Sequence, residues 1–165
     1  DDPVIFLENK MLYDVTGEVP DQSYTLPFAE ARVVKDGPDA TIFALGQMVQ
    51  FSEKASELLA DKGLNVSIID LRTTSPLDED TIIEFTEQTG RVVIVDESYP
   101  RCGFAADIAA FISSEAFEHL KAPISRVTPP HTPVPYSPAL EKVFLPNPER
   151  ITQAVVDLCN FKKAL

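Results

Sequence analysis

The sequence predicts an α/β fold: a three-layer sandwich with a mainly parallel sheet and one antiparallel edge strand. The first observation is the stretch 41–71, in which two short apolar runs without alternation flank a segment of helical periodicity. Such runs are typical of strands covered on both faces, and a crossover helix between them requires parallel pairing in a right-handed unit. The second observation is that strand-like and helix-like segments go on alternating downstream, which predicts helices on both faces of one sheet.

The first thirty residues differ from the rest of the chain. Residues 4–7 (V-I-F-L) predict a buried strand, but no neighbouring strand precedes them. Residues 9–28 are polar and interrupted by glycine and proline, which is typical of a linker. We therefore expect residues 1–30 to be the end of a truncated domain plus a linker, and residues 31–165 to form one domain. Because the first residue is Asp1, we expect a processed chain or a piece of a longer protein.

The edge strand is predicted at 31–35. The turn sequence D-G-P-D at 36–39 follows it and leaves too few residues for a crossover, so we expect this strand to pair antiparallel with the strand at 41–45. A helix follows from Met48, and Gly63 stands where a left-handed cap belongs. Its predicted inner face consists of Met48, Phe51, Ala55, Leu58 and Leu59.

The next elements repeat this pattern. A buried strand is predicted at 66–71, and Asp78 is a good N-cap for a short helix that Gly90 closes. Acidic residues in the first turn of that helix complement its dipole. A third parallel strand is expected at 92–95, where every side chain is β-branched.

The last part of the chain supplies two further helices and one more strand. Gly103 introduces one helix, 124–127 predicts the fourth parallel strand, and Asn147 followed by proline begins the terminal helix. A proline-rich crossing at 128–138 lies between them. The predicted inner faces of the two helices are Phe104, Ile108, Phe111, Ile112, Phe117 and Leu120, and Ile151, Ala154, Val155 and Leu158.

Composition excludes several classes of function. The net charge of −12 argues against a nucleic-acid or anionic-membrane surface, and the apolar runs are too short to cross a bilayer. The two cysteines, Cys102 and Cys159, have neither metal-ligand spacing nor a disulfide pattern. We expect reduced thiols in the bacterial cytoplasm or, in a eukaryote, the mitochondrial matrix. Cys102 is interpreted as an ordinary buried thiol, with a reactive thiol at a helix start as the alternative.

Four segments follow predicted parallel strands and are expected to share one rim of the sheet, namely 46–47, 72–74, 96–98 and 128–131. Ligands and partners of open parallel sheets gather at this rim. No glycine-rich phosphate loop occurs in the chain, so Gly46 is interpreted as a turn between a strand and a helix.

The polar residues of this rim give weak individual indications. Arg72 is a candidate for gripping an anionic group, with a structural salt bridge as an equal alternative. Asp96 and Glu97 form a candidate carboxylate pair, but neighbouring residues at a strand end point in different directions, so capping is favoured. His131 lies among prolines without a visible nucleophile nearby, and His119 is expected at the surface. From the residues alone, we infer an α/β domain without a self-contained active site.

An ordered series of motifs resembles one family. It begins with L-E-N-K-M-L-Y, A-R-V-V-K-D-G-P-D-A-T-I-F-A-L-G and D-L-R-T-T-S-P-L-D-E-D-T-I, and continues with G-R-V-V-I-V-D-E-S, G-F-A-A-D-I-A, A-P-I-S-R-V and H-T-P-V-P-Y-S-P-A-L-E. The chain resembles the transketolase-like C-terminal domain of the beta subunit of thiamine-diphosphate-dependent 2-oxo acid dehydrogenases. Its proline-rich motif most resembles acetoin dehydrogenase beta subunits, with pyruvate and branched-chain 2-oxo acid enzymes as close rivals.

The resemblance implies a role in a multienzyme complex. Alpha and beta subunits would form a heterotetramer that binds thiamine diphosphate and magnesium, and the acyl unit would pass to the lipoyl group of an acyltransferase component. Residues 1–30 would then end a truncated pyrimidine-binding domain, and the family's activating glutamate and its histidine would lie upstream. We therefore expect no catalytic, cofactor-binding or metal-binding residue in this chain, no cofactor in it alone, and an assembly and docking role. Candidate rim or interface residues are Arg72, Glu97, Tyr99 and His131.

Three hypotheses remain at this point. The first is an enzyme part that is inactive alone, and the second is a free-standing α/β interaction or regulatory module. The third is a small-molecule-binding domain, which a polar rim pocket lined by Arg72, Glu97 and His131 would support and a flat apolar rim would oppose.

Overall fold

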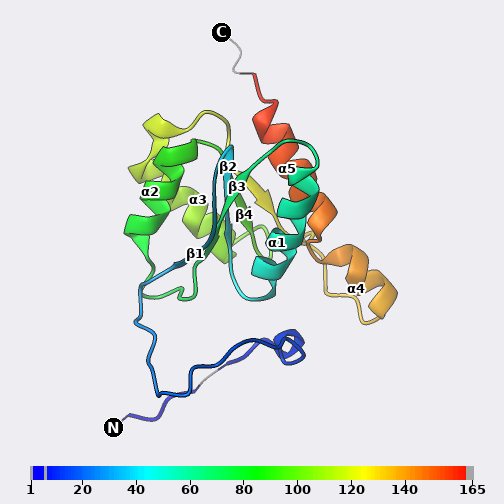
Figure 1. Ribbon diagram of the computed structural model, residues 1–165. Helices are drawn as coiled ribbons and strands as arrows, with labels where there is room; N and C mark the ends of the chain where they lie inside the picture. The colour runs from blue at the N-terminus through cyan, green and yellow to red at the C-terminus, as the bar shows by residue number, and fades with distance from the viewer. Residues whose placement is uncertain (1, 6, 163–165) are drawn as a thin grey trace.

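The computed structural model describes residues 2–5 and 7–162 and contains one five-stranded sheet between two layers of helices (Figure 1). The strand order is β1-β3-β2-β4-β5. Their bounds are β1 Arg32–Pro38, β2 Ala40–Ala44, β3 Val66–Asp70, β4 Val92–Val95 and β5 Ser125–Val127. The β2–β3, β2–β4 and β4–β5 pairs are parallel, which confirms the predicted mainly parallel three-layer sandwich.

Helices cover both faces of the sheet. One face carries α1 (Gln47–Ala60) and α5 (Pro148–Cys159), and the other carries α2 (Glu79–Thr89) and α3 (Phe104–Glu115) (Figure 1). Three short elements complete the described chain: the 3-10 helices η1 (Lys10–Leu12) and η2 (Phe117–His119), and the helix α4 (Pro138–Phe144). The sequence analysis did not predict α4, because it follows a proline-rich crossing.

The neighbour of the edge strand differs from the prediction. β1 is antiparallel, as expected, but it pairs with β3 rather than with β2, and Arg32 lies opposite Asp70. The reason is that β2 is central and already pairs with β3 and β4 on its two sides, so β1 pairs instead with the outer edge of β3. Gly37 permits this crossing, because a Cβ there would lie 2.7 Å from the carbonyl carbon of Asn65.

Each helical layer buries its own cluster of apolar side chains against the sheet. Met48, Ala55 and Leu59 of α1 are fully buried, as predicted. Leu58 is 40% exposed, because Ser52 and Ser56 occupy the positions of the helix that face the sheet. The hydroxyls of these two serines donate to the carbonyls of Met48 and Glu53, which makes their burial tolerable. Phe117, predicted to be inward-facing, is 70% exposed, since α3 ends before it and the helical phase is lost.

The predicted helix ends are confirmed at the positions where a side-chain cap or a glycine ends the helix. Asp78 accepts from the Thr81 N–H at 3.0 Å and Asn147 accepts from the Arg150 N–H at 2.9 Å. Gly90 closes α2 in the left-handed region at φ +68°, and Gly63 has φ +75° just after α1. These local interactions hold the strand ends in place.

The predicted strand at 4–7 is wrong for its described residues. Val4, Ile5 and Leu7 are in no strand and are 85%, 87% and 90% exposed, whereas Phe6 lies outside the described residues. The described chain offers them no partner strand, and an apolar run without a sheet edge does not form a strand on its own. Residues 9–28 contain only η1, in agreement with their linker composition. No helix of the described residues is both long and apolar enough to cross a membrane.

Candidate functional site

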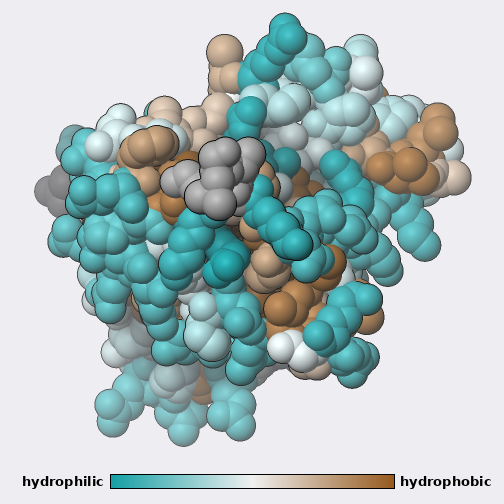
Figure 2. All heavy atoms as spheres, turned by 90° about the horizontal axis from the view of Figure 1, so that it is seen from above, coloured by the Kyte–Doolittle hydropathy of each residue, from teal (hydrophilic) through white to brown (hydrophobic). Residues whose placement is uncertain are grey.

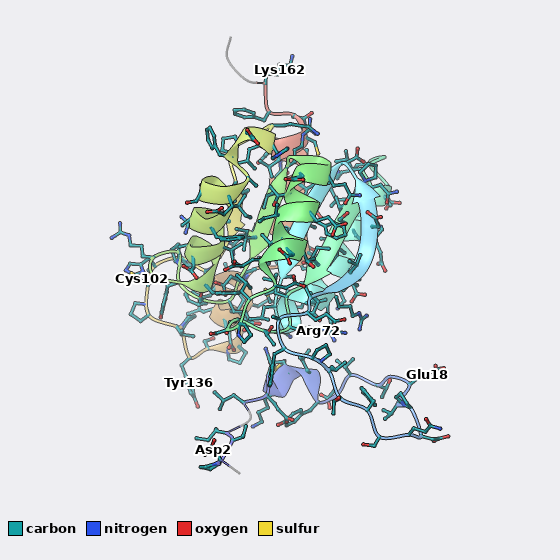
Figure 3. The ribbon with its side chains drawn as sticks, turned by 90° about the vertical axis from the view of Figure 1, so that its left-hand side faces the viewer. Asp2, Glu18, Arg72, Cys102, Tyr136 and Lys162 are labelled. Atoms are coloured by element: carbon teal, nitrogen blue, oxygen red, sulfur yellow. The ribbon has the colours of Figure 1, made fainter. Side chains whose placement is uncertain are left out.

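A cavity of about 800 Å³ lies where the carboxyl ends of three parallel strands meet. Its wall on the sheet side is made by residues that directly follow β2, β3 and β4, and residues 7–13 of the N-terminal segment close it from below. Figure 3 shows Arg72 at this end of the domain, facing the N-terminal segment. The predicted convergence of the strand ends on one rim is therefore confirmed for these three strands. The sheet-side lining is Leu45, Gly46, Asp70, Arg72, Asp96 and Glu97.

Asn9 holds the N-terminal segment against this rim. Its side-chain Oδ1 accepts the Met11 N–H at 3.0 Å and so caps η1, while its Nδ2 donates to Glu97 Oε1 at 3.4 Å. A Cβ on Gly46 would lie 3.7 Å from the same Asn9 Nδ2. In the same segment, the Tyr13 hydroxyl donates to Glu8 at 2.7 Å. Asn9 was not among the predicted site residues, because in the sequence it resembles any other polar residue of a linker.

The two adjacent carboxylates have different tasks, as predicted. Asp96 accepts the Ala105 N–H at 2.9 Å in the first turn of α3, and it also accepts the N–H and the hydroxyl of Ser98. Glu97 instead faces the cavity. Asp96 therefore caps the start of α3, and Glu97 is the carboxylate available to a partner or ligand.

The surroundings of Glu97 raise the pKa of its carboxyl above the ordinary value. Partial burial raises the pKa of the Glu97 carboxyl, and the charge of Asp96 adds to the increase, while the hydrogen bond from Asn9 opposes it. Asp70 at the end of β3, which β2 separates from β4, also lines the cavity. Glu97 thus shares the cavity with three other carboxylates, those of Glu8, Asp70 and Asp96.

Arg72 is the cation of the cavity and has an uncommon backbone conformation. Its φ is +57°, and its N–H donates to Asp70 Oδ1 at 3.1 Å. Among residues 2–5 and 7–162, no carboxylate lies within salt-bridge distance of the Arg72 guanidinium. The alternative of a structural salt bridge is thus unsupported among the described residues, and the Arg72 guanidinium can meet an anionic group or a carboxylate of another chain.

The other two candidate residues form a separate pair. The rings of Tyr99 and His131 stack edge to face with centroids 5.6 Å apart, and both side chains are exposed. Neither residue lines the cavity. The four candidates therefore divide into Arg72 with Glu97 inside the cavity and Tyr99 with His131 outside it.

Cys102 and His119 lie away from the cavity. Cys102 is exposed, so the predicted buried thiol is wrong. It lies in the loop before α3, where the chain turns through a φ of +54° and leaves the side chain outside the core. His119 is partly exposed at the surface, as expected, with Glu87 at 3.3 Å and Glu118 at 3.5 Å from its Nε2.

The cavity does not have the chemistry of a diphosphate or metal site. Four carboxylates line it, from Glu8, Asp70, Asp96 and Glu97, against the single guanidinium of Arg72. A diphosphate would be repelled by this set of charges. In the described part of the chain, no group of three or more His, Cys, Asp or Glu side chains is arranged to hold a metal ion. The arrangement fits recognition of a partner or of a small molecule better than cofactor chemistry.

Exposed apolar side chains accompany the cavity at this end of the molecule. The segment containing α4 leaves Val134, Tyr136, Leu140 and Val143 at least 59% exposed, and Tyr136 points away from the body of the domain toward the N-terminal segment (Figure 3). At the end where the C-terminus lies, hydrophilic side chains cover most of the surface and hydrophobic ones form separate patches (Figure 2). Large exposed apolar patches in soluble domains mark sites of association.

Comparison with known proteins shows one consistent relationship. A family model described as transketolase, C-terminal domain, matches residues 29–151. Acetoin:2,6-dichlorophenolindophenol oxidoreductase subunit beta of Cupriavidus necator is 51% identical over 153 residues, covering 93% of this chain and 45% of the relative. The protein of the same description from Bacillus subtilis is 45% identical, covering 95% of this chain and 46% of the relative.

Other relatives and a solved structure agree with this. Pyruvate dehydrogenase E1 component subunit beta of Rickettsia bellii is 40% identical, covering 98% of this chain and 50% of the relative. A split gene transketolase, described as an inactive beta4 tetramer, superimposes with a TM-score of 0.74 at 24% identity, covering 89% of this chain and 47% of that one. At that identity the superposition supports the fold alone. The chain spans about half the length of the relatives it matches.

Proposed function

Because the chain belongs to the transketolase C-terminal domain family, we propose that it is the C-terminal domain of the beta subunit of a thiamine-diphosphate-dependent dehydrogenase. The observation that carries this proposal is the 51% identity to an acetoin oxidoreductase beta subunit over 93% of the chain. Acetoin is the first candidate substrate, followed by pyruvate and branched-chain 2-oxo acids. The complete enzyme would decarboxylate or cleave its substrate and pass the acyl unit to a lipoyl group.

Within this enzyme, the domain serves assembly through its rim. The carboxyl ends of β2, β3 and β4 form the floor of a cavity, and the apolar side chains of the α4 segment are exposed at the same end of the domain (Figure 3). The Arg72 guanidinium, which has no salt bridge among the described residues, and the exposed apolar groups suit contact with the alpha subunit and a second beta subunit. The lipoyl-bearing acyltransferase would dock on a surface away from this rim.

Thiamine diphosphate and magnesium belong to the complete heterotetramer in this proposal. The carboxylate-rich cavity of this chain does not fit a diphosphate, and the described residues contain no metal-binding group of three. The cofactor would therefore be held by other parts of the enzyme, and no chemical step is assigned to this chain. The compartment proposed is the bacterial cytoplasm, or the mitochondrial matrix in a eukaryote.

Reconstitution of the complete enzyme tests the proposal. The full-length beta subunit is combined with an alpha subunit from the same organism, and reduction of 2,6-dichlorophenolindophenol is followed with acetoin, pyruvate or 2-oxoisovalerate. Activity that requires added thiamine diphosphate with one of these substrates is the expected result. Absence of activity with all three substrates, in a complex that forms, would refute the enzymatic proposal.

The assembly role has its own test. Val143 on α4 is 75% exposed, so Val143→Glu leaves the core intact and places a charge on the proposed contact surface. We expect this variant to weaken the subunit complex in sedimentation velocity, while its unfolding midpoint stays unchanged. Leu58→Glu, on the exposed side of α1, is the matched control. Equal assembly of the two variants would argue against the assembly surface at α4.

The cavity itself favours a second candidate, a binding or regulatory module with a ligand site at the rim. Its volume of about 800 Å³ lies in the range of small-molecule sites, and both Arg72 and Glu97 line it, although His131 does not. Calorimetric binding of a small molecule to the chain without partner subunits, abolished by Arg72→Ala, would support this alternative. Activity that depends on the alpha subunit would favour the first proposal.

A further inference from the structure

The sheet has an open edge at the strand β5. It pairs with β4 on one side, and in the described chain no strand pairs with its other side. β5 is only three residues long, as is common for edge strands that avoid uncontrolled association. An open edge presents backbone donors and acceptors that an added strand can use.

A groove of about 500 Å³ runs along this open edge, between β5 and the helix α5. We call it the β5–α5 groove. Residues 123–127 form one wall over the whole length of β5, and α5 together with the residues that follow it forms the other. Strands in a sheet lie about 4.8 Å apart, so a groove bordered by an edge strand suits one extended peptide.

The groove is net positive in a strongly acidic chain. Its charged lining residues are Arg126, Arg150 and Asp157, a net charge of +1, whereas the whole chain carries −12. Among residues 2–5 and 7–162, neither arginine has a carboxylate within salt-bridge distance. The groove therefore attracts a negatively charged ligand, although the net charge of the whole protein would repel it.

Backbone carbonyls hold both guanidinium groups without neutralising them. Arg126 Nη1 donates to the Pro100 carbonyl at 2.7 Å, and Arg150 donates to the carbonyls of Thr128 at 2.6 Å and Leu145 at 3.2 Å. A guanidinium has five N–H donors, so further donors remain on each group. Because the side chains are already oriented, binding a carboxylate immobilises little additional side-chain freedom.

The other end of the groove is apolar. Ile124 of the strand side, Leu158 of α5 and Phe161 beyond the helix line it, and Phe161 is 43% exposed. Arg150 lies in the first turn of α5, whereas Leu158 and Phe161 lie at and beyond its last turn. The groove thus has a cationic end near the end of β5 and an apolar end near its start.

We propose that the β5–α5 groove binds an extended acidic peptide of a partner protein by adding it as a sixth strand to the sheet. The peptide's main chain pairs with the open edge of β5, its carboxylate side chains lie on the face of the sheet from which Arg126 projects, and its apolar side chains contact Phe161 on the side of α5. This inference is independent of the proposed enzymatic function, because the groove is separate from the rim cavity.

Two fluorescein-labelled pentapeptide probes test the proposal on the full-length protein. One is Glu-Val-Glu-Val-Glu and the other is Lys-Val-Lys-Val-Lys, both blocked at their ends, and binding is followed by fluorescence polarisation. We expect saturable binding of the acidic probe only, weakened by added salt. Preference for the basic probe, which the net charge of the chain would favour, or no binding of either, would overturn the proposal.

Variants and hydrogen exchange locate the binding. Arg126→Glu should weaken the acidic probe by about tenfold or more, since it reverses a charge in the groove. Arg32→Glu is the matched control, because Arg32 is an exposed arginine on the opposite edge strand β1. In the unmodified protein, the acidic probe should slow amide exchange within 123–127. Equal effects of the two substitutions, or unchanged exchange in this segment, would refute binding at β5.

Discussion

Replacing Gly90 by alanine tests two physical reasons for a glycine at this position, backbone strain and a steric clash. Gly90 ends α2 with φ +68°, a region in which a Cβ is strained. A Cβ there would also lie 2.5 Å from the carbonyl oxygen of His119 and 2.9 Å from Lys121 Cγ. The Lys121 N–H donates to the Gly90 carbonyl at 2.8 Å, so the opposing backbone is tied to this position and moves away with difficulty.

The expected loss of stability combines both effects. A non-glycine residue in the left-handed region costs roughly 1–2 kcal/mol, and an overpacked contact against backbone adds about 1–3 kcal/mol. Gly90→Ala should therefore lower the free energy of unfolding by about 2–5 kcal/mol, the sum of these two ranges. This is a large share of the roughly 5–15 kcal/mol that stabilises an ordinary domain.

Two other glycines supply the matched controls. Gly63 has φ +75° but nothing within 4 Å of its Cβ position, so Gly63→Ala should show the backbone strain alone. Gly37 lies outside the left-handed region but faces the Asn65 carbonyl carbon at 2.7 Å, so Gly37→Ala should show the steric clash alone.

Urea unfolding followed by far-ultraviolet circular dichroism measures all three variants. Gly90→Ala should lower the midpoint more than Gly63→Ala, and the slope of the transition should stay constant so that the free energies can be compared. A loss at Gly90 no greater than at Gly63 would refute the steric argument. It would mean that the η2 turn shifts to admit a methyl group at little cost.

Three further predictions concern titratable groups. Burial alone would raise the pKa of Asp78, but the hydrogen bonds that its carboxylate accepts prevail and lower it. The Asp78 carboxylate therefore stabilises the fold at pH values above its ordinary pKa of 3.8, and this stability is lost as the pH falls through its lower pKa in the folded protein. Asp78→Ala should lower the free energy of unfolding by about 1–2 kcal/mol at neutral pH. Unfolding experiments should also show a weaker dependence of stability on acid pH in this variant. Carbon-detected NMR titration should find the pKa of Glu97 above its ordinary 4.5, and Asn9→Ala should raise it further; an unchanged value would show that the two side chains are not paired in solution. The exposed thiol of Cys102 should react with Ellman's reagent well before Cys159, because burial raises the pKa of the Cys159 thiol; the reverse order would contradict the described surface.

Much of the fold was predictable because it depends on neighbours in the sequence. The caps at Asp78, Gly90 and Asn147 act within four residues, and the buried strands were recognisable from unbroken apolar runs. The same approach was wrong for residues 4–7, where an apolar run has no partner strand among the described residues. It was wrong for Leu58 as well, because the apolar pattern of α1 does not show that two serines take inward positions.

The sequence predicted where the candidate site lies in the fold but not which of the candidate residues line it. Parallel strands end at the same rim, so the position of Arg72 and Glu97 followed from topology. Their separation from Tyr99 and His131 did not follow, since it depends on where each loop turns after its strand.

By itself, the sequence determined the α/β class, the helix ends capped by Asp78, Gly90 and Asn147, and the family, because each is encoded in local spacing or in an ordered set of motifs. Only the tertiary structure decided that β1 pairs with β3 and that Asn9 reaches Glu97, 88 positions away. The physical reason is that a strand edge or a hydrogen-bonding group accepts whichever partner the closed chain brings to it, and local sequence carries no record of that partner.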